Sequence, residues 1–331
     1  MNLSYINLNT TDAEWNLAAE QYVFDAMPRD RIYFMLWQNE RAVIIGKYQN
    51  AQAEINAEYV KQHHIQVVRR LSGGGAVYHD LGNLNFSFIA DAGAMEKLDL
   101  RLFCGPVIHT LQSLGVPAVI NGRNDMTVDG KKFSGNSQYK KQGRVLHHGT
   151  ILFDSDLDAV ELALHADEQK LRSKGVASVR SRVTNLRSYL PAELGLDDFR
   201  ALLLRQVLQE NPGEEYYFTE KDRQAIREIK EQRYSRWDWN YGRSPAGQIE
   251  KKRHIEGCGT VSAFLSTDQG KICGLSFQGD FFSTRDPERL AEALIGCRLR
   301  ESDIADALTG VDPELYVHGM SRHALIQLLL Y

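Results

Sequence analysis

Cysteine is scarce in this chain. The four cysteines are too few and too widely spaced for a disulfide framework or a C-x-x-C metal site; they are Cys104, Cys258, Cys273 and Cys297. We therefore expect buried free thiols and a cytoplasmic protein. The first residues lack the basic and apolar regions of a secretory signal, and no apolar run is long enough for a membrane span.

Charge of one sign is not in large excess. The formal net charge of −4 argues against a general nucleic-acid binder, although it leaves room for a local basic pocket. A hydrophobic content of 43% and a charged content of 25% are typical of a globular protein. With 331 residues, the chain is long enough for one large and one small domain.

The common phosphate and nucleophile motifs are also missing. The sequence has no G-x-x-x-x-G-K-[ST] and no G-x-G-x-x-G, which excludes a P-loop and a dinucleotide fingerprint. It contains no G-x-S-x-G elbow either. The chemistry of the site is therefore expected to rest on cations and hydrogen bonds.

The most informative segment is a run of three glycines, Gly73–Gly75, which follows Arg69 and Arg70. Consecutive glycines lose much backbone freedom on folding, so their presence indicates a backbone that something approaches closely. Successive N–H groups in such a turn form an anion-binding nest, and the two guanidinium groups add positive charge. We predict a phosphate-bearing ligand here; the alternative is a tight turn or bulge without a ligand.

An aromatic stretch that ends in Gly and Pro, Arg236–Pro245, marks a domain boundary. Before it, helices are expected at 12–27, 53–62, 98–114, 158–165, 196–209 and 219–233. Strands in the same part are expected at 31–37, 42–45, 66–71, 84–89 and within 125–153. After the boundary, strands are expected at 251–258, 259–267 and 271–277, and helices at 287–294, 301–308 and 321–330. We place the domains at 1–243 and 246–331.

Asp129-Gly130 predicts a two-residue hairpin turn, and a second turn is expected near Lys141-Gln142-Gly143. Because side chains alternate along the strand that follows, Lys131 faces one way and the other face carries Lys132, Ser134 and Asn136. That face either lines a polar site or is exposed to solvent, with lysines protecting a sheet edge.

A pair of histidines, His147-His148, lies on the returning strand. Two neighbours on a strand face opposite ways and cannot share an ion, and no matching third ligand appears, so no metal site is expected. We predict that one histidine is satisfied in the core and that the other lies near the ligand.

Three motifs, taken in order, resemble those of the lipoate–protein ligase family. They are Arg69–Asp80 (RRLSGGGAVYHD), Asp129–Gly135 (DGKKFSG) and His147–Thr150 (HHGT), and Asn83–Ser87 fits as well. Trp237–Pro245 and Gly279–Phe282 are similar to segments of the long, two-domain members. The resemblance covers nearly the whole chain. It implies a mixed-sheet α/β (α+β) catalytic domain of the biotin/lipoate protein ligase type and a small α+β C-terminal accessory domain.

The resemblance also implies the reaction and its participants. The reaction is ATP-dependent activation of lipoate to lipoyl-AMP, followed by transfer to a lysine of a lipoyl carrier domain. The implied carriers are E2 subunits of 2-oxoacid dehydrogenases and the glycine cleavage H protein; nucleic acid and membrane are not expected partners. ATP would act with Mg²⁺, lipoate is a substrate, and no tightly bound prosthetic group is expected. We expect a monomer.

By motif position, Lys132 is the central lysine, and Asp125 is a candidate acceptor for the proton of the carrier lysine. The residues implied to bind ATP, lipoate or the adenylate are Arg70, Ser72, Gly73, Gly74, Gly75, Ala76, Val77, Tyr78, His79, Asn83, Lys132, Ser134 and His148. One departure is Ser137, where a small apolar residue is frequent in the family; we expect it to tune the pocket.

These residue types suit the chemistry. In the first step a carboxylate attacks the α-phosphate of ATP, so cations must offset the repulsion between two anions. In the second step Lys132 would stabilise negative charge on the carbonyl oxygen. The dithiolane needs an apolar slot, whose walls we expect from residues 66–71 and 84–89. A hinge near Gly242–Pro245 would let the second domain cover the site for the first step and move aside for the carrier.

Two other functions stay open. One is lipoyl or octanoyl transfer from an acyl carrier, which normally needs a cysteine or lysine nucleophile; no cysteine lies in the motif regions. The other is a non-catalytic binder of lipoyl carriers. The presence of Arg70, Gly73–Gly75 and Lys132 argues against that binder.

Overall fold

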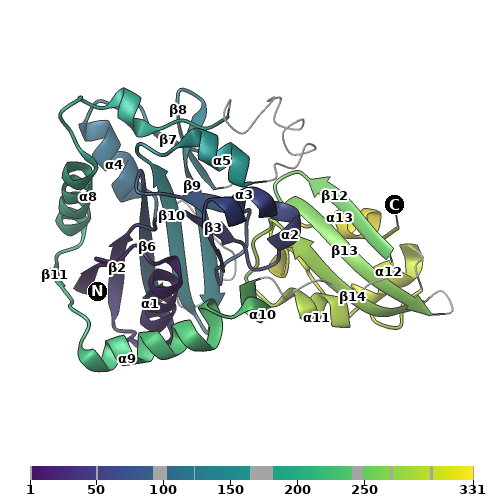
Figure 1. The fold of residues 1–331 in the computed structure, drawn as a ribbon. Helices are drawn as coiled ribbons and strands as arrows, with labels where there is room; N and C mark the ends of the chain where they lie inside the picture. Colours follow the sequence, from purple (N-terminus) through teal and green to yellow (C-terminus); the bar gives the residue numbers. More distant parts are fainter. Residues whose placement is uncertain are drawn as a thin grey trace.

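The computed structural model describes residues 2–49, 51–91, 103–122, 124–164, 182–240, 249–268, 271–298 and 301–330. An eight-stranded mixed sheet forms the centre of the larger part, in the order β11-β1-β2-β6-β10-β9-β8-β7 (Figure 1). In that order the strands are Gly213–Glu215, Asn2–Asn7, Arg31–Trp37, Asn83–Asp91, Arg144–Leu152, Lys131–Lys141, Asp125–Val128 and Val119–Asn121. β1 runs parallel to β11 and β2, and the other neighbours are antiparallel.

Helices lie against both faces of this sheet (Figure 1). The helices and helical turns of the larger part are α1 (Ala13–Ala26), α2 (Ala51–Glu54), α3 (Ala57–Gln62), α4 (Gly105–Ser113), α5 (Leu157–Ala163), η1 (Leu186–Tyr189), α8 (Leu196–Glu210), α9 (Glu220–Ile229), η2 (Lys230–Tyr234) and α10 (Trp237–Asn240). Alternation along β2 divides its side chains between two cores. Phe34 and Leu36 pack with α4 and α8, whereas Tyr33 and Trp37 pack with α1 and α9.

Several predicted elements begin and end as expected. β2 and β3 (Ala42–Ile45) match their predicted bounds, and Asp12 caps α1 by accepting the N–H of Glu14. The helix expected at 53–62 is instead two helices, because the side chain of Asn56 accepts the N–H of Tyr59 and starts α3. The predicted helix at 98–114 begins at Gly105 in the structure, and residues 92–102 lie outside the described ranges.

Both predicted hairpin turns have the left-handed backbone that a type I′ turn requires. Asp129 and Gly130 have φ values of 48° and 75°, and Gln142 and Gly143 have values of 50° and 77°. These turns join β8 to β9 and β9 to β10, so the motif strands lie side by side in the central sheet.

A smaller sheet presents the glycine run. β3 lies between β4 (Gln66–Arg69), to which it is parallel, and β5 (Val77–His79), to which it is antiparallel. The glycines therefore occupy the connection between the two outer strands, 70–76. The sequence did not indicate β5, which is only three residues long.

The C-terminal part has its own antiparallel sheet and its own core (Figure 1). Its elements are β12 (Ile249–Ile255), β13 (Gly259–Asp268), β14 (Lys271–Gly279), α11 (Pro287–Glu292), α12 (Glu301–Ala307), η3 (Pro313–Leu315) and α13 (Arg322–Leu330). This arrangement confirms the predicted α+β character. The proposed hinge near Gly242–Pro245 lies outside the described residues.

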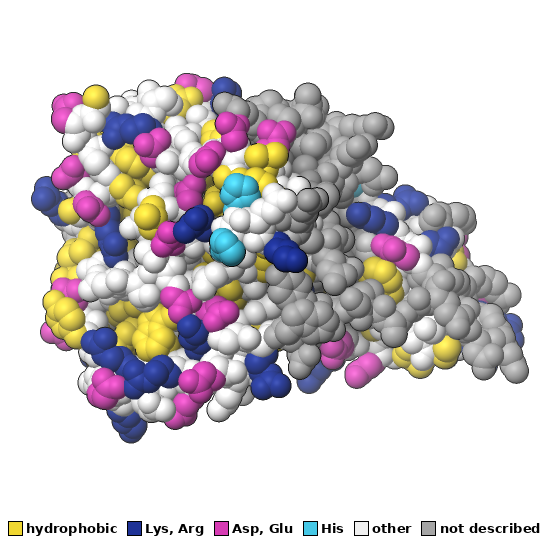
Figure 2. Space-filling view, in the orientation of Figure 1, with side chains coloured by type: hydrophobic (Ala, Val, Ile, Leu, Met, Phe, Trp, Pro, Cys, Tyr) yellow, Lys and Arg dark blue, Asp and Glu magenta, His cyan; other side chains and the backbone are white. Residues whose placement is uncertain are grey.

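The cysteines and the surface complete this description. Cys104 and Cys258 are buried free thiols, but Cys273 is exposed and Cys297 is partly exposed, so the prediction of buried thiols holds for only two of the four. Basic and acidic side chains are interspersed on the face in Figure 2. Of the helices in the described ranges, none is both long and apolar enough to cross a membrane.

Candidate active site

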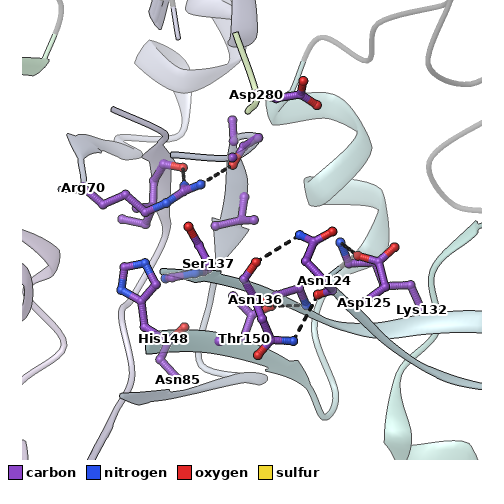
Figure 3. Close-up of a pocket in the computed structure, with 18 of the residues that line it drawn as sticks. Arg70, Asn85, Asn124, Asp125, Lys132, Asn136, Ser137, His148, Thr150 and Asp280 are labelled. Atoms are coloured by element: carbon purple, nitrogen blue, oxygen red, sulfur yellow. Dashed lines mark hydrogen bonds and ion pairs between the residues drawn. The ribbon is translucent and has the colours of Figure 1, made fainter. Parts of the chain in front are cut away.

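One pocket brings together most of the motif residues (Figure 3). From the predicted set it is lined by Arg70, Gly74, Gly75, Ala76, Val77, His79, Asp125, Lys132 and His148. Its lining also includes residues outside the predicted set of site residues: Leu17, Trp37, Ile44, Asn85, Asn124, Gly135, Asn136, Ser137, Gly149, Thr150, Arg182, Asp280 and Phe282. In Figure 3, Lys132 and Asp125 lie on one side of this pocket, and Arg70 and His148 lie on the other.

Arg70 holds the glycine run in shape. Its Nη2 donates to the carbonyl oxygens of Gly73 (2.6 Å) and Gly75 (2.9 Å), and its Nη1 donates to that of Ile44 (3.0 Å). Its Nε donates to Ser72 Oγ (3.0 Å). Burial lowers the pKa of Arg70 to about 10, so the guanidinium stays charged at neutral pH. Arg70 therefore lines the pocket as a cation whose position is fixed by the loop it supports.

The sequence predicts that the guanidinium groups of Arg69 and Arg70 both lie beside the ligand. The structure corrects this for Arg69, which does not line the pocket. It is fully buried, and its guanidinium donates to the carbonyl oxygens of Gly46 (2.8 Å), Gln49 (2.6 Å), Trp239 (3.0 Å) and Asn240 (3.0 Å). Strand alternation sends consecutive arginines to opposite sides, so Arg69 ties α10 to the loop after β3.

The glycines are approached closely, but in this structure the neighbour is the C-terminal part. The N–H of Gly74 donates to the carbonyl oxygen of Phe281 at 2.7 Å. A Cβ at Gly73 would collide with the same carbonyl, and Gly74 has a φ of 92°, which favours glycine. Ser137, the noted departure from the family pattern, lines the pocket and donates to the carbonyl oxygen of Gly73 at 2.8 Å.

Lys132 lines the pocket, whereas its neighbour Lys131 is exposed. Its Nζ lies 2.7 Å from Asp125 Oδ1, and Arg182 Nη2 lies 3.1 Å from Asp125 Oδ2. One carboxylate therefore holds two cations at the pocket. Arg182 carries no motif signal, so the sequence did not point to it.

A β-bulge corrects the predicted face of this strand. Thr127 pairs with Lys132 and Met126 pairs with Ser134, so one extra residue, Phe133, breaks the regular alternation. The bulge places Lys132 over Gly135, where a Cβ would lie 2.8 Å from the lysine Nζ. Ser134 is fully buried and accepts a hydrogen bond from Asn136 Nδ2 (3.3 Å). Unlike Lys132, it does not line the pocket.

The two histidines divide as predicted. His147 is buried in the core, where Gln138 Nε2 lies 3.1 Å from its Nδ1, and burial lowers its pKa to about 3. His148 lines the pocket, and its Nε2 lies 2.6 Å from Ser72 Oγ. Within the described ranges, no cluster of three or more His, Cys, Asp or Glu side chains could hold a metal ion.

Five predicted binding residues are absent from the pocket lining: Ser72, Gly73, Tyr78, Asn83 and Ser134. Tyr78 packs into a core beside β3, where burial raises its pKa to about 12. Asn83 is fully buried and donates to Asn85 Oδ1 (2.9 Å), and it is Asn85 that lines the pocket. His79 does line the pocket; burial, followed by the charge of Arg70, lowers its pKa to about 3.

The apolar wall comes from other elements than expected. Its side chains include Leu17 of α1, Trp37 of β2, Ile44 of β3 and Val77 of β5. The predicted wall segments 66–71 and 84–89 contribute only the polar residues Arg70 and Asn85. The wall is thus assembled from single apolar residues far apart in the sequence.

Two family models match the chain. The model of the lipoyl protein ligase A/B catalytic domain matches residues 12–208, and that of the bacterial lipoate protein ligase C-terminus matches residues 244–329. The chain belongs to the lipoate–protein ligase family. The lipoate-protein ligase LplJ of Bacillus subtilis is 41% identical over 326 residues, which cover 98% of each chain. The similarity to this ligase spans both parts, which agrees with the ligase predicted from the motifs.

Solved structures agree with this family. The crystal structure of Plasmodium falciparum LipL1 in complex with lipoate has the same fold, with a TM-score of 0.81, 22% identity and coverage of 99% of both chains. A lipoate-protein ligase A bound with ATP has a TM-score of 0.64 and 28% identity, and the match covers 73% of this chain and 99% of that one. Both support the lipoate–protein ligase fold predicted from the motifs.

Proposed function

We propose that this lipoate–protein ligase uses the pocket described above for both steps of its reaction. The observation that carries the proposal is one cavity that combines an apolar wall with three cations. Leu17, Trp37 and Ile44 suit the dithiolane and its aliphatic chain, while Arg70, Lys132 and Arg182 suit a phosphate.

In the first step, the lipoate carboxylate attacks the α-phosphorus of ATP, and pyrophosphate leaves. Both reactants are anions, so Lys132 and Arg182 hold them together while Arg70 maintains the glycine loop. ATP enters as its Mg²⁺ complex, which is part of the substrate. The N–H groups of the glycine loop add hydrogen bonds to the phosphate wherever they are exposed.

In the second step, the amine of a carrier lysine attacks the carbonyl carbon of lipoyl-AMP, and AMP leaves. The ammonium of Lys132 stabilises the negative charge that builds on the carbonyl oxygen. The carboxylate of Asp125 lies 2.7 Å from this ammonium and lines the same pocket. We therefore assign Asp125 first to holding Lys132, and second to accepting the proton of the incoming amine.

The partners follow from this chemistry. The acceptors are lipoyl domains of 2-oxoacid dehydrogenase E2 subunits and the glycine cleavage H protein, and the ligase acts on them as a cytoplasmic monomer. Residues 1–243 form the catalytic domain and residues 246–331 the accessory domain. Separate hydrophobic cores on the two sides of α10 support this division.

The test is pyrophosphate release from ATP, measured with and without lipoate and with and without an apo lipoyl domain. We expect release to require lipoate, to stop after about one turnover without the lipoyl domain, and to continue with it. Acyl transfer from an acyl carrier protein without pyrophosphate release would instead identify an acyltransferase. Tight binding of the lipoyl domain without either reaction would identify a non-catalytic binder.

A further inference from the structure

A buried carboxylate lies behind the pocket and is connected to its cationic side. Arg70 Nε donates to Ser72 Oγ at 3.0 Å, and Ser72 Oγ lies 2.6 Å from His148 Nε2. The other ring nitrogen of the histidine, Nδ1, lies 2.9 and 3.0 Å from the two oxygens of Glu20. Glu20, on α1, is only 2% exposed, so this chain of hydrogen bonds ends inside the protein.

The same carboxylate is connected to the apolar side. Trp37 Nε1 donates to Ser87 Oγ at 2.9 Å, and Ser87 Oγ donates to Glu20 Oε1 at 2.6 Å. Trp37 and Arg70 both line the pocket, one in its apolar wall and one beside its glycine loop. Glu20 therefore joins the two halves of the site, although it stands behind the residues that line it.

The hydrogen atoms in both series of hydrogen bonds can be placed, because some of the groups can only donate. Arginine Nε and tryptophan Nε1 can only donate, so Ser72 and Ser87 each accept one bond and direct their own hydrogen onward. The carboxylate oxygens of Glu20 accept, so the proton between them and His148 is assigned to Nδ1 of the histidine. His148 Nε2 is then the acceptor for Ser72. In this assignment every donor in the two hydrogen-bond chains has an acceptor.

This arrangement resembles a Ser–His–acid triad, but it is not set up as a nucleophile. Ser72 is buried, and its oxygen already accepts the hydrogen bond of Arg70. A buried carboxylate is also expensive unless it is hydrogen-bonded, so packing alone does not account for Glu20 at this position.

We propose that Glu20 is a positioning residue for the adenylation step. It keeps the proton of His148 on Nδ1, and through Ser72 it fixes Arg70 and the glycine loop; through Ser87 it fixes Trp37. The inference rests on the proposed role of this pocket, and it predicts that the two arms act on different steps. The Ser72 arm governs the rate of adenylation, and the Ser87 arm governs lipoate binding.

The first test is Glu20→Gln, which keeps the shape but removes the charge. One amide oxygen can still accept from Ser87, but an NH₂ donor replaces the oxygen that lies 3.0 Å from His148 Nδ1, a nitrogen that already carries a proton, so the Ser72 arm loses an acceptor. We expect the kcat of lipoate-dependent pyrophosphate release to fall about 10- to 100-fold, the usual effect of losing an outer-shell partner. Glu14→Gln, on the same helix beside Lys230, is the matched control and should keep the wild-type rate.

Two further readouts separate positioning from stability. In ¹⁵N-histidine-labelled protein, the signal lost in His148→Gln identifies His148. We expect a strongly hydrogen-bonded Nδ1 proton in the wild type that shifts in Glu20→Gln and not in Glu14→Gln. In a double-mutant cycle, Glu20→Gln and Ser72→Ala together should lose no more rate than the worse single variant, because they break one chain.

The inference is overturned if wild-type His148 carries its proton on Nε2, or if the losses of rate in the two single variants multiply in the double variant.

Ser87→Ala provides an independent test if Glu20→Gln does not fold. It should raise the KM for lipoate about tenfold and leave kcat near the wild-type value; an unchanged KM contradicts the second arm. A wild-type protein without lipoate-dependent pyrophosphate release would refute the proposed function, while the histidine signal would still decide the position of the proton.

Discussion

The N–H of Gly74 donates a hydrogen bond to the carbonyl oxygen of Phe281, at 2.7 Å, and so joins the glycine loop to the C-terminal part. The same carbonyl explains Gly73, where a side chain would collide with it. The close approach that the glycines predict therefore exists, but the backbone of the second domain makes it. A phosphate that needs the Gly74 amide has to compete with the docked domain.

Lys132→Ala should slow both half-reactions by about 100- to 1000-fold, because one ammonium serves first the phosphate and then the carbonyl oxygen. Lys131→Ala is the matched control, since Lys131 is exposed and outside the pocket lining. The measurements are pyrophosphate release from ATP and lipoate, and carrier modification from synthetic lipoyl-AMP. A severe loss in Lys131→Ala, with Lys132→Ala nearly unaffected, would mean that the roles of the two lysines are reversed.

Local signals predicted much of the fold. The capped α1, the strands β2 and β3 and both hairpin turns depend on residues close in sequence, so their bounds could be read directly. The bulge at Phe133 could not, because it depends on how β9 pairs with β8. The motif residues located the pocket but, apart from Val77, not the apolar wall formed by Leu17, Trp37 and Ile44.

The contacts that the sequence did not indicate were missed for one physical reason: they depend on tertiary packing. Leu17 and Trp37 belong to amphipathic elements, and nothing local distinguishes a residue that lines a cavity from one that fills a core. Glu20 looks like an ordinary polar residue of a helix until His148 and Ser87 are brought against it. Phe281 meets Gly74 only through the packing of the second domain.

Folding stability should fall in mild acid because two buried histidines are neutral. Burial lowers the pKa of His79 and of His147 to about 3, from 6.5 when unfolded. Between these values the unfolded chain binds more protons, so the free energy of unfolding decreases as pH falls below about 6.5. At pH 5.5 each histidine removes about 1.4 kcal/mol relative to pH 7.5, and the two together remove about 3 kcal/mol.

Urea unfolding at pH 7.5 and pH 5.5 checks this. His147→Gln should shrink the difference between the two pH values by about 1.4 kcal/mol, whatever it does to stability at pH 7.5. His323→Gln, on the exposed side of α13, should leave the difference unchanged. The explanation is wrong if His147→Gln and the wild type lose the same stability on acidification.

Replacing all four cysteines by serine should leave turnover largely intact. Cys104 lies 4.0 Å from His147, which faces away from the pocket-lining His148, and Cys258 is buried in the C-terminal core. The burial of new hydroxyl groups at these two positions should lower stability by about 1–3 kcal/mol each. A folded variant that loses all activity, and regains it when one cysteine is restored, would support an acyl-enzyme mechanism instead.

The docking of the second domain can be weakened without touching the pocket. Tyr48 OH lies 2.6 Å from Ser283 Oγ, the Tyr48 ring stacks on Phe281, and Gly279 N–H donates to the Tyr48 carbonyl at 2.7 Å. Ser283→Ala removes one of these contacts, which is worth about 0.5–1.5 kcal/mol. Ser302→Ala is the control, since Ser302 is exposed on α12 and donates to Asp303.

The docked domain covers the pocket with Phe282, but it also places the carboxylate of Asp280 there and occupies the amide of Gly74. Both features oppose an incoming triphosphate, so the docked arrangement has to loosen before ATP binds. Ser283→Ala should therefore lower the KM for ATP by about 2- to 10-fold, because a larger fraction of the protein is competent to bind ATP.

The assay is pyrophosphate release over a range of ATP concentrations, with carrier modification from preformed lipoyl-AMP measured in parallel. A KM that rises instead would mean that this docked arrangement is the one that closes over ATP for adenylation. An unchanged KM in both assays would mean that docking at Tyr48 is not coupled to the nucleotide.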